Sequence, residues 1–307
     1  MHGRMLAVGL AIAGLVTVGV ASPATAAPPR VIEAQASGTI TTGSLTNAAG
    51  TRSYQTYSPR RAQPNRPLFV WLHGASKVDE GDPQDLRRTS TLLLEADRRG
   101  YSVVAPMQSL RVDPAGTWQP QNPNNEMRGR GEPSIIADIV RRAIRDLHAD
   151  PARVYIVGHS AGGATTQTVA ALYSELFAGV ATSAGIPYLA DPTGLAIRVA
   201  RRGRPLPTFI VQGTKDSVTP PVLGQIGLSA AMNSNGIAGS RPWSSTTVPA
   251  SQTDPYRTVL TRYGHGRTEV DYAEVVGAEH WTGPGGVTVN GRALDRRLID
   301  FLLSKHR

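Results

Sequence analysis

One serine of this chain stands in a pattern that could perform nucleophilic chemistry. Ser160 lies between Gly158 and Gly162, after the apolar run Val154–Val157 and before a segment rich in helix-forming residues. A sharp turn from strand to helix holds a serine in a strained conformation with its Oγ exposed at the carboxyl edge of a sheet. The two glycines would face each other across that turn, where a Cβ would collide. The pattern predicts a nucleophilic Ser160; a glycine-rich loop with an incidental serine is the alternative.

A serine hydroxyl is a weak nucleophile and needs a base to accept its proton. The histidines after Ser160 are His265, His280 and His306. His280 directly follows the last predicted strand (269–276), so it can fold over the edge of the sheet. The other two lie in stretches that favour a solvated surface histidine. We therefore expect His280 to be the general base.

The base needs a carboxylate to hold its tautomer and orientation. Asp216 follows the predicted strand 208–212 almost directly and lies between the serine and the histidine in the chain. Asp254 has no strand before it, and Asp271 falls inside a predicted strand, so both are weaker candidates. The order serine, aspartate, histidine predicts Ser160, Asp216 and His280 as a catalytic triad.

Acyl transfer also requires hydrogen-bond donors for the developing oxyanion. The backbone N–H of Ala161, directly after the serine, is one expected donor. The second is expected from the loop after the early apolar run 68–72, where Ala75 follows His73 and Gly74.

The elements that must position these residues alternate between strands and helices. Strands are expected at 68–72, 101–105, 154–157, 179–183, 208–212 and 269–276, and helices at 86–99, from 133 to about 147, from 161 to about 177, and at 294–303. Residues 39–45 and 53–57 flank a turn and predict an antiparallel hairpin. The fold class is therefore α/β, with a mostly parallel central sheet, helices on both faces and an N-terminal hairpin.

The chain begins with the features of an export signal. Arg4 precedes the apolar run 6–20, and a small-residue site at Ala26 or Ala27 follows it. The run is short for a membrane span of about 20 residues, so cleavage is favoured over an anchor. We expect a signal peptide at 1–27, a linker at 28–37, one catalytic domain at 38–307 and a secreted, extracellular protein.

The composition argues against several other classes of function. There is no cysteine, and the histidines show no metal-binding spacing, so neither a metal nor another cofactor is expected. The formal charge is +9, but the arginines are spread along the chain without a nucleic-acid-binding motif. No nucleic-acid partner is expected, and nothing in the sequence indicates an oligomeric state.

Several sequence blocks resemble the polyhydroxybutyrate depolymerase family of secreted α/β-hydrolases, which is similar to feruloyl and acetylxylan esterases. The resemblance extends from about residue 68 to 303 and rests on blocks at 72–74, 130–133, 150–155, 160–164, 177–179, 184–188, 213–216 and 280–281. It implies the α/β-hydrolase fold and the same triad. It also implies a cleft lined by aromatic side chains, for which the candidates are Trp118, Tyr188 and Trp281; packed aromatic residues are the alternative for each.

Two positions depart from that family. Ala75 stands where the family often has a cysteine bonded to the loop that here carries Trp118, and Thr282 and Gly283 separate Trp281 from the proline that usually follows it. Both departures concern the geometry of the loops around the substrate.

The triad and the resemblance lead to one main hypothesis. It is a secreted serine esterase that hydrolyses carboxylic esters through an acyl-enzyme, with poly(3-hydroxybutyrate) or short hydroxyalkanoate esters as substrates. A feruloyl or acetylxylan esterase acting on plant polysaccharide esters is the alternative. A non-catalytic secreted binding protein on a hydrolase scaffold is the alternative of another class, and such a protein usually lacks a triad residue.

Overall fold

The computed structural model describes residues 36–75, 86, 90–120, 122–185, 203–251, 255–280 and 292–307, with side chains described for all of these except 90–91 and 292–296. The expected signal peptide (1–27) and most of the expected linker lie outside the described residues. Within the described part, no helix is both long and apolar enough to cross a membrane.

Ten strands form one sheet with the order β1-β2-β4-β3-β5-β6-β7-β10-β9-β8. The strands are β1 (Thr39–Asn47), β2 (Gly50–Ser58), β3 (Arg66–Leu72), β4 (Ser102–Pro106), β5 (Ala149–His159), β6 (Gly179–Ser183), β7 (Thr208–Gly213), β8 (Ser244–Val248), β9 (Thr258–Tyr263) and β10 (Val270–Val275). The central strands, from β4 through β3, β5, β6 and β7 to β10, run parallel. Antiparallel strands flank them at both edges. The α/β prediction with its N-terminal hairpin is confirmed.

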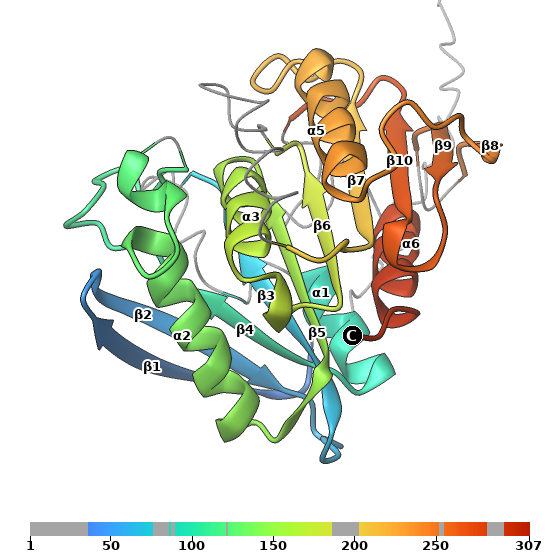
Figure 1. Ribbon diagram of the computed structural model, residues 1–307. Helices are drawn as coiled ribbons and strands as arrows, with labels where there is room; N and C mark the ends of the chain where they lie inside the picture. Colours follow the sequence, from blue (N-terminus) through green and yellow to red (C-terminus); the bar gives the residue numbers. More distant parts are fainter. Residues whose placement is uncertain are drawn as a thin grey trace, which may run out of the picture. The chain divides into compact units, whose positions relative to one another are not determined.

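Helices cover both faces of this sheet (Figure 1). The α-helices are α1 (Ser90–Arg99), α2 (Gly131–Asp146), α3 (Ala161–Leu172), α5 (Pro221–Ser234) and α6 (Arg292–Leu303), and short 3-10 helices lie at η3 (Pro123–Glu126), η4 (Ser174–Leu176) and η5 (Gly266–Thr268). Helices α1 and α6 pack on one face, and α2, α3 and α5 pack on the other.

The sequence of β3 shows why a two-sided sheet forms. Phe69 and Trp71 enter the core under α1 and α6, whereas Leu68, Val70 and Leu72 enter the core under α2 and α3. Successive side chains of a strand point to opposite faces, so a continuous apolar run must be covered on both. Burying each such side chain is worth about 1.5–3 kcal/mol.

The two strands at one edge, β8 and β9, have no counterpart in the predicted elements. Residues 244–248 are Ser-Ser-Thr-Thr-Val and have three exposed side chains. Strand β8 is the edge strand and pairs only with β9, so it needs no apolar alternation, which is the signal that the prediction depends on. The helix expected from residue 161 to about 177 also ends earlier, because Tyr173 caps α3 and the 3-10 helix η4 follows it.

The parallel strands bring their carboxyl ends to one edge of the sheet. Leu72 at the end of β3 pairs with Gly158 in β5. Farther along the sheet, Gly213 at the end of β7 pairs with Val275 at the end of β10. Every residue of the expected triad follows one of these strand ends.

Candidate active site

Ser160 occupies a strained turn between β5 and α3. Its backbone angles are φ 54° and ψ −124°, in a region that costs an L-residue about 1–3 kcal/mol. Two glycines make the turn possible: a Cβ on Gly158 would lie 2.3 Å from the carbonyl oxygen of Gly162, and one on Gly162 would lie 2.2 Å from that of Leu72. The Ser160 N–H donates to the carbonyl of Ser183 at 3.0 Å, which ties the turn to β6.

The structure brings the three expected triad residues together. Ser160 Oγ lies 3.0 Å from His280 Nε2, and His280 Nδ1 lies 2.8 Å from Asp216 Oδ2. His280 is 2% exposed and Asp216 is 3% exposed. The serine hydroxyl therefore has a base within hydrogen-bond reach, and the base has a carboxylate partner on its other nitrogen.

The loops that carry Asp216 and His280 are bonded to each other. The N–H of Lys215 donates to the carbonyl of Ala278 at 2.9 Å, and the N–H of Gly277 donates to Thr214 Oγ1 at 2.8 Å. These bonds continue the pairing of β7 with β10 beyond the strand ends. Bonds between the two loops thus hold the acid and the base near each other.

Asp216 is buried, and its carboxylate accepts four hydrogen bonds. Its Oδ1 accepts from the N–H groups of Val218 and Thr219 at 2.9 and 2.7 Å, and its Oδ2 accepts from Thr219 Oγ1 at 2.6 Å as well as from His280. Burial alone would raise the pKa of Asp216, but the bonds from Thr219 and His280 outweigh it and lower that pKa. The carboxylate therefore remains ionised at neutral pH.

Thr219 is a site residue that the sequence reasoning missed. Its hydroxyl contacts both Asp216 and His280 Nδ1, the latter at 3.2 Å, and the residue has no exposed surface. The sequence feature that could have indicated it is the position of Thr219 in the turn after Asp216, because aspartate side chains often bond the backbone of the turn that follows them.

His159 was also missed as a residue of the site. Its buried ring lies 5.0 Å from the ring of His280, and its Nδ1 lies 3.3 Å from Ser183 Oγ. Burial, together with the charge that His280 can carry, lowers the pKa of His159 to about 3. A neutral imidazole therefore packs beside His280.

The backbone positions expected to donate to an oxyanion lie next to the serine. Ala161 is the first residue of α3, and the first N–H groups of a helix have no acceptor within the helix. Ala75 follows Gly74, on which an added Cβ would lie 3.2 Å from Ser160 Cβ. The loop after β3 thus borders the nucleophile.

The other candidates for base and acid lie elsewhere. The ring of His265 stacks on that of Trp243 at 5.1 Å, and His306 lies exposed near the end of the chain. Asp271 lies within β10 and pairs with Arg262, whereas Asp254 falls outside the described residues.

The expected aromatic lining needs one correction. Trp118 is 0% exposed and belongs to the core with α2 and α3, with its ring 5.3 Å from that of His73. A side chain without accessible surface does not line an open cleft, so the prediction for Trp118 is wrong. Tyr188 and Trp281 lie outside the described residues.

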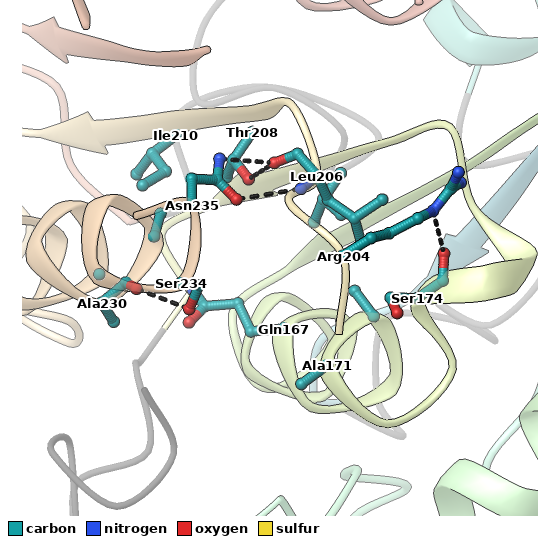
Figure 2. A pocket seen from close by; sticks show the side chains of 14 residues that line it. Gln167, Ala171, Ser174, Arg204, Leu206, Thr208, Ile210, Ala230, Ser234 and Asn235 are labelled. Atoms are coloured by element: carbon teal, nitrogen blue, oxygen red, sulfur yellow. Dashed lines mark hydrogen bonds between the residues drawn. The ribbon is translucent and has the colours of Figure 1, made fainter. Parts of the chain in front are cut away.

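A hollow of about 60 Å³ lies between α3 and α5 (Figure 2). Its lining includes Gln167, Arg204 and Asn235, and it contains no triad residue. The side chain of Asn235 bonds both the N–H and the carbonyl of Leu206, and Arg204 bonds the carbonyl of Ser174. These hydrogen bonds hold the segment before β7 in place.

Among the described residues, no group of three or more acidic, histidine or cysteine side chains could hold a metal.

Comparison with known proteins identifies a family for this chain. Residues 52–236 match the family described as esterase PHB depolymerase. The chain belongs to this family. The matched region includes Ser160 and Asp216, and His280 lies beyond it.

The curated relatives of this chain include a depolymerase and an acetylxylan esterase. Poly(3-hydroxyalkanoate) depolymerase C of Paucimonas lemoignei is 33% identical over 124 residues, which are 40% of this chain and 29% of that protein. Acetylxylan esterase A of Emericella nidulans is 30% identical over 191 residues, 62% of this chain and 57% of that protein. The matches thus span less than two thirds of each relative.

Among solved structures, an acetyl xylan esterase from Aspergillus awamori superimposes with a TM-score of 0.63. The match covers 85% of this chain and 98% of the other at 19% identity. At that identity the likeness shows the α/β-hydrolase fold.

Proposed function

We propose that the protein is a serine esterase that hydrolyses carboxylic esters through an acyl-enzyme. The observation that carries this proposal is the hydrogen-bonded series from Ser160 Oγ through His280 to Asp216, which is buried at the carboxyl edge of the sheet. Membership in an esterase family supports the reaction class.

In the first half of the reaction, Ser160 Oγ attacks the carbonyl carbon of the ester. His280 Nε2 accepts the hydroxyl proton, and the ionised Asp216 stabilises the resulting imidazolium through Nδ1. The carbonyl π electrons move to oxygen, and the N–H groups of Ala75 and Ala161 stabilise this oxyanion. When the intermediate collapses, His280 gives its proton to the departing alcohol, and the acyl group stays on Ser160.

In the second half, water attacks the acyl-enzyme. His280 Nε2 takes a proton from that water, a second tetrahedral intermediate forms in the same oxyanion pocket, and collapse returns the proton to Ser160 Oγ. The products are a carboxylic acid and the free serine. The neutral His159 beside His280 adds no positive charge that would oppose imidazolium formation.

For the substrate, we favour poly(3-hydroxybutyrate) or short hydroxyalkanoate esters. The family description and the depolymerase among the relatives support this choice. A feruloyl or acetylxylan esterase is the second candidate, because the relative with the longer match and the similar solved structure are acetylxylan esterases.

We also propose that the protein is secreted, on the basis of the export signal at 1–27. The mature N-terminus measured after expression in an exporting bacterium tests this proposal. Cleavage after Ala26 or Ala27 supports it, and an intact N-terminus in the cell fraction contradicts it.

The reaction is tested by replacing Ser160→Ala and measuring hydrolysis of p-nitrophenyl butyrate. We expect a loss of at least about 10⁴-fold, with an unchanged unfolding temperature, because the serine forms the covalent bond. A fluorophosphonate probe should label the wild type and not the variant. Absence of labelling in the wild type would favour a non-catalytic binding protein.

Three substrates measured side by side separate the substrate classes. Hydroxybutyrate oligomers, methyl ferulate and acetylated xylan are offered to the same purified mature protein. If kcat/KM is highest on the oligomers, the depolymerase assignment is supported. If it is highest on methyl ferulate or acetylated xylan, the protein is a feruloyl or an acetylxylan esterase instead.

A further inference from the structure

The loop after β3 carries a histidine whose two ring nitrogens have different partners. His73 Nδ1 lies 2.7 Å from the carbonyl oxygen of Gly74, and the backbone N–H of Gln108 donates to His73 Nε2 at 3.1 Å. A backbone N–H can only donate, so Nε2 carries a lone pair, and the proton of the neutral ring is on Nδ1. The ring therefore donates to the Gly74 carbonyl.

This carbonyl belongs to the same peptide group as the N–H of Ala75. A trans peptide is planar, with its C=O and N–H pointing in opposite directions, and the described chain has no cis peptide. A bond that holds the Gly74 oxygen therefore also fixes the direction of the Ala75 N–H. His73 thus controls the orientation of an expected oxyanion donor.

Gln108 is itself held by its side chain. Its Nε2 donates to the Thr117 carbonyl at 3.0 Å and to Glu132 Oε1, and its Oε1 accepts from the N–H of Ser109 at 2.9 Å. The residue is 3% exposed. With its amide bonded on three sides, Gln108 presents its own backbone N–H to His73 in one direction.

Glu132 connects this arrangement to the first turn of α2. Its Oε2 accepts from the N–H of Gln119 at 2.9 Å, and its own N–H donates to Asn125 Oδ1 at 2.7 Å. The side chain is buried, and both carboxylate oxygens accept hydrogen bonds from the loop before the helix. A rigid helix is thereby linked to the loop residue that contacts His73.

We propose that Glu132 and Gln108 are positioning residues for the oxyanion hole: acting through His73, they aim the Ala75 N–H at the oxyanion that forms on the substrate. The inference rests on the proposed function. Neither side chain takes part in the proton transfers. Their loss would let the Gly74–Ala75 peptide rotate, which weakens binding of the transition state and leaves ground-state binding nearly unchanged.

Glu132→Gln is the main test, because it keeps the size of the side chain. One acceptor oxygen becomes an NH₂ group that must face the donor of Gln108 or of Gln119. We measure hydrolysis of an alkyl butyrate and of its thiono analogue, in which sulfur replaces the carbonyl oxygen. Sulfur accepts hydrogen bonds weakly, so the ratio of the two kcat/KM values reports on the oxyanion donors and is independent of the fraction of active enzyme.

We expect Glu132→Gln to lower kcat on the butyrate about tenfold, with KM changed less than about twofold, and to lower the oxygen-to-sulfur ratio about fivefold. These effects are below the 10²–10³-fold loss of kcat typical when a whole donor is removed. Ser134→Ala is the matched control. Ser134 is buried in the same helical turn and loses only its bond to the Gly131 carbonyl, so this variant should leave the ratio unchanged.

Two further sets of variants keep the test decisive if Glu132→Gln does not fold. Gln108→Met removes the amide at similar length and should lower the ratio equally. His73→Asn retains a donor near the Nδ1 position, whereas His73→Gln retains an acceptor near Nε2, so the asparagine variant should keep the higher ratio.

An unchanged ratio in the folded variants overturns the inference, whatever the unfolding temperature does, and so does a wild-type ratio near one. The proposed function fails separately, if Ser160→Ala retains activity. Wild-type activity that depends on Ser160, together with an unchanged ratio in the variants, would refute the positioning role alone.

Discussion

Replacing Thr219 by valine removes the hydroxyl that donates to Asp216 Oδ2 and contacts His280 Nδ1. The side chain is fully buried and valine has nearly the same shape, so water does not replace the lost hydroxyl. Asp216 Oδ2 would then accept only from His280, while Oδ1 keeps its two backbone donors. The perturbation therefore acts on the oxygen that stabilises the imidazolium.

A hydrogen bond to a charged group contributes about 1.5–3 kcal/mol. The Thr219 hydroxyl stabilises ionised Asp216 both before and during the reaction, so only part of this energy should appear in the barrier. If about half does, the barrier rises by about 0.75–1.5 kcal/mol, which corresponds to a loss of about four- to thirteenfold. The pKa of Asp216 should rise toward its usual value, because this hydroxyl helps to lower it.

The assay is kcat/KM for p-nitrophenyl butyrate, with active enzyme counted by fluorophosphonate titration. Thr219→Ser is the matched control, because it keeps the hydroxyl, and it should remain within about twofold of the wild type. If Thr219→Val hydrolyses the ester as fast as the wild type, the account of how Asp216 is held is wrong.

Two other substitutions test the turn and the core. Gly162→Ala should inactivate the enzyme at least about 100-fold and destabilise it by about 1–3 kcal/mol, because the new Cβ would lie 2.2 Å from a backbone oxygen. Gly227→Ala in α5, where the nearest atom is 3.7 Å away, should be neutral or stabilising; equal thermal unfolding of the two variants would contradict this account. Burial and the charge of Glu269 raise the pKa of Asp271 to about 6, so the native state binds a proton that the unfolded state has already released, and stability falls as pH rises from about 4 to 6. Asp271→Asn should therefore stabilise the protein by about 1–3 kcal/mol at pH 8 and much less at pH 4, as measured by urea unfolding at both pH values; an equal gain at both would show that the charge is not the cause.

The parts of the site that could be predicted are those that the local sequence determines. The turn at Ser160 needs glycine on both sides, a strand before it and a helix after it, and all of these lie within about twenty consecutive residues. Asp216 and His280 were predictable because each directly follows a buried strand, and parallel strands end at one edge. Position along the chain was therefore enough to predict that His280, and not His265, lies between Ser160 and Asp216.

The remaining parts depend on contacts between distant segments. Burial of Trp118 results from packing of its loop against α2 and β3, and nothing within the loop sequence indicates it. The bond between Gln108 and Glu132 joins residues 24 apart, and that between Gln108 and His73 joins residues 35 apart. Such pairs carry no periodic signal, because each partner is a single polar residue in an irregular stretch.

The triad and the oxyanion donors differ in the same way: local sequence indicates the triad, whereas contacts between distant segments orient the donors. A nucleophile, a base and an acid are side chains, so their identities appear in the sequence and their order can be compared with known patterns. Oxyanion donors are backbone groups, which every residue except proline possesses, and only their orientation makes them useful. That orientation depends on the neighbours that hold the peptide, here His73 and the residues behind it. Substitutions far from the triad in the chain, at Gln108 or Glu132, should therefore change the rate more than their distance from Ser160 suggests.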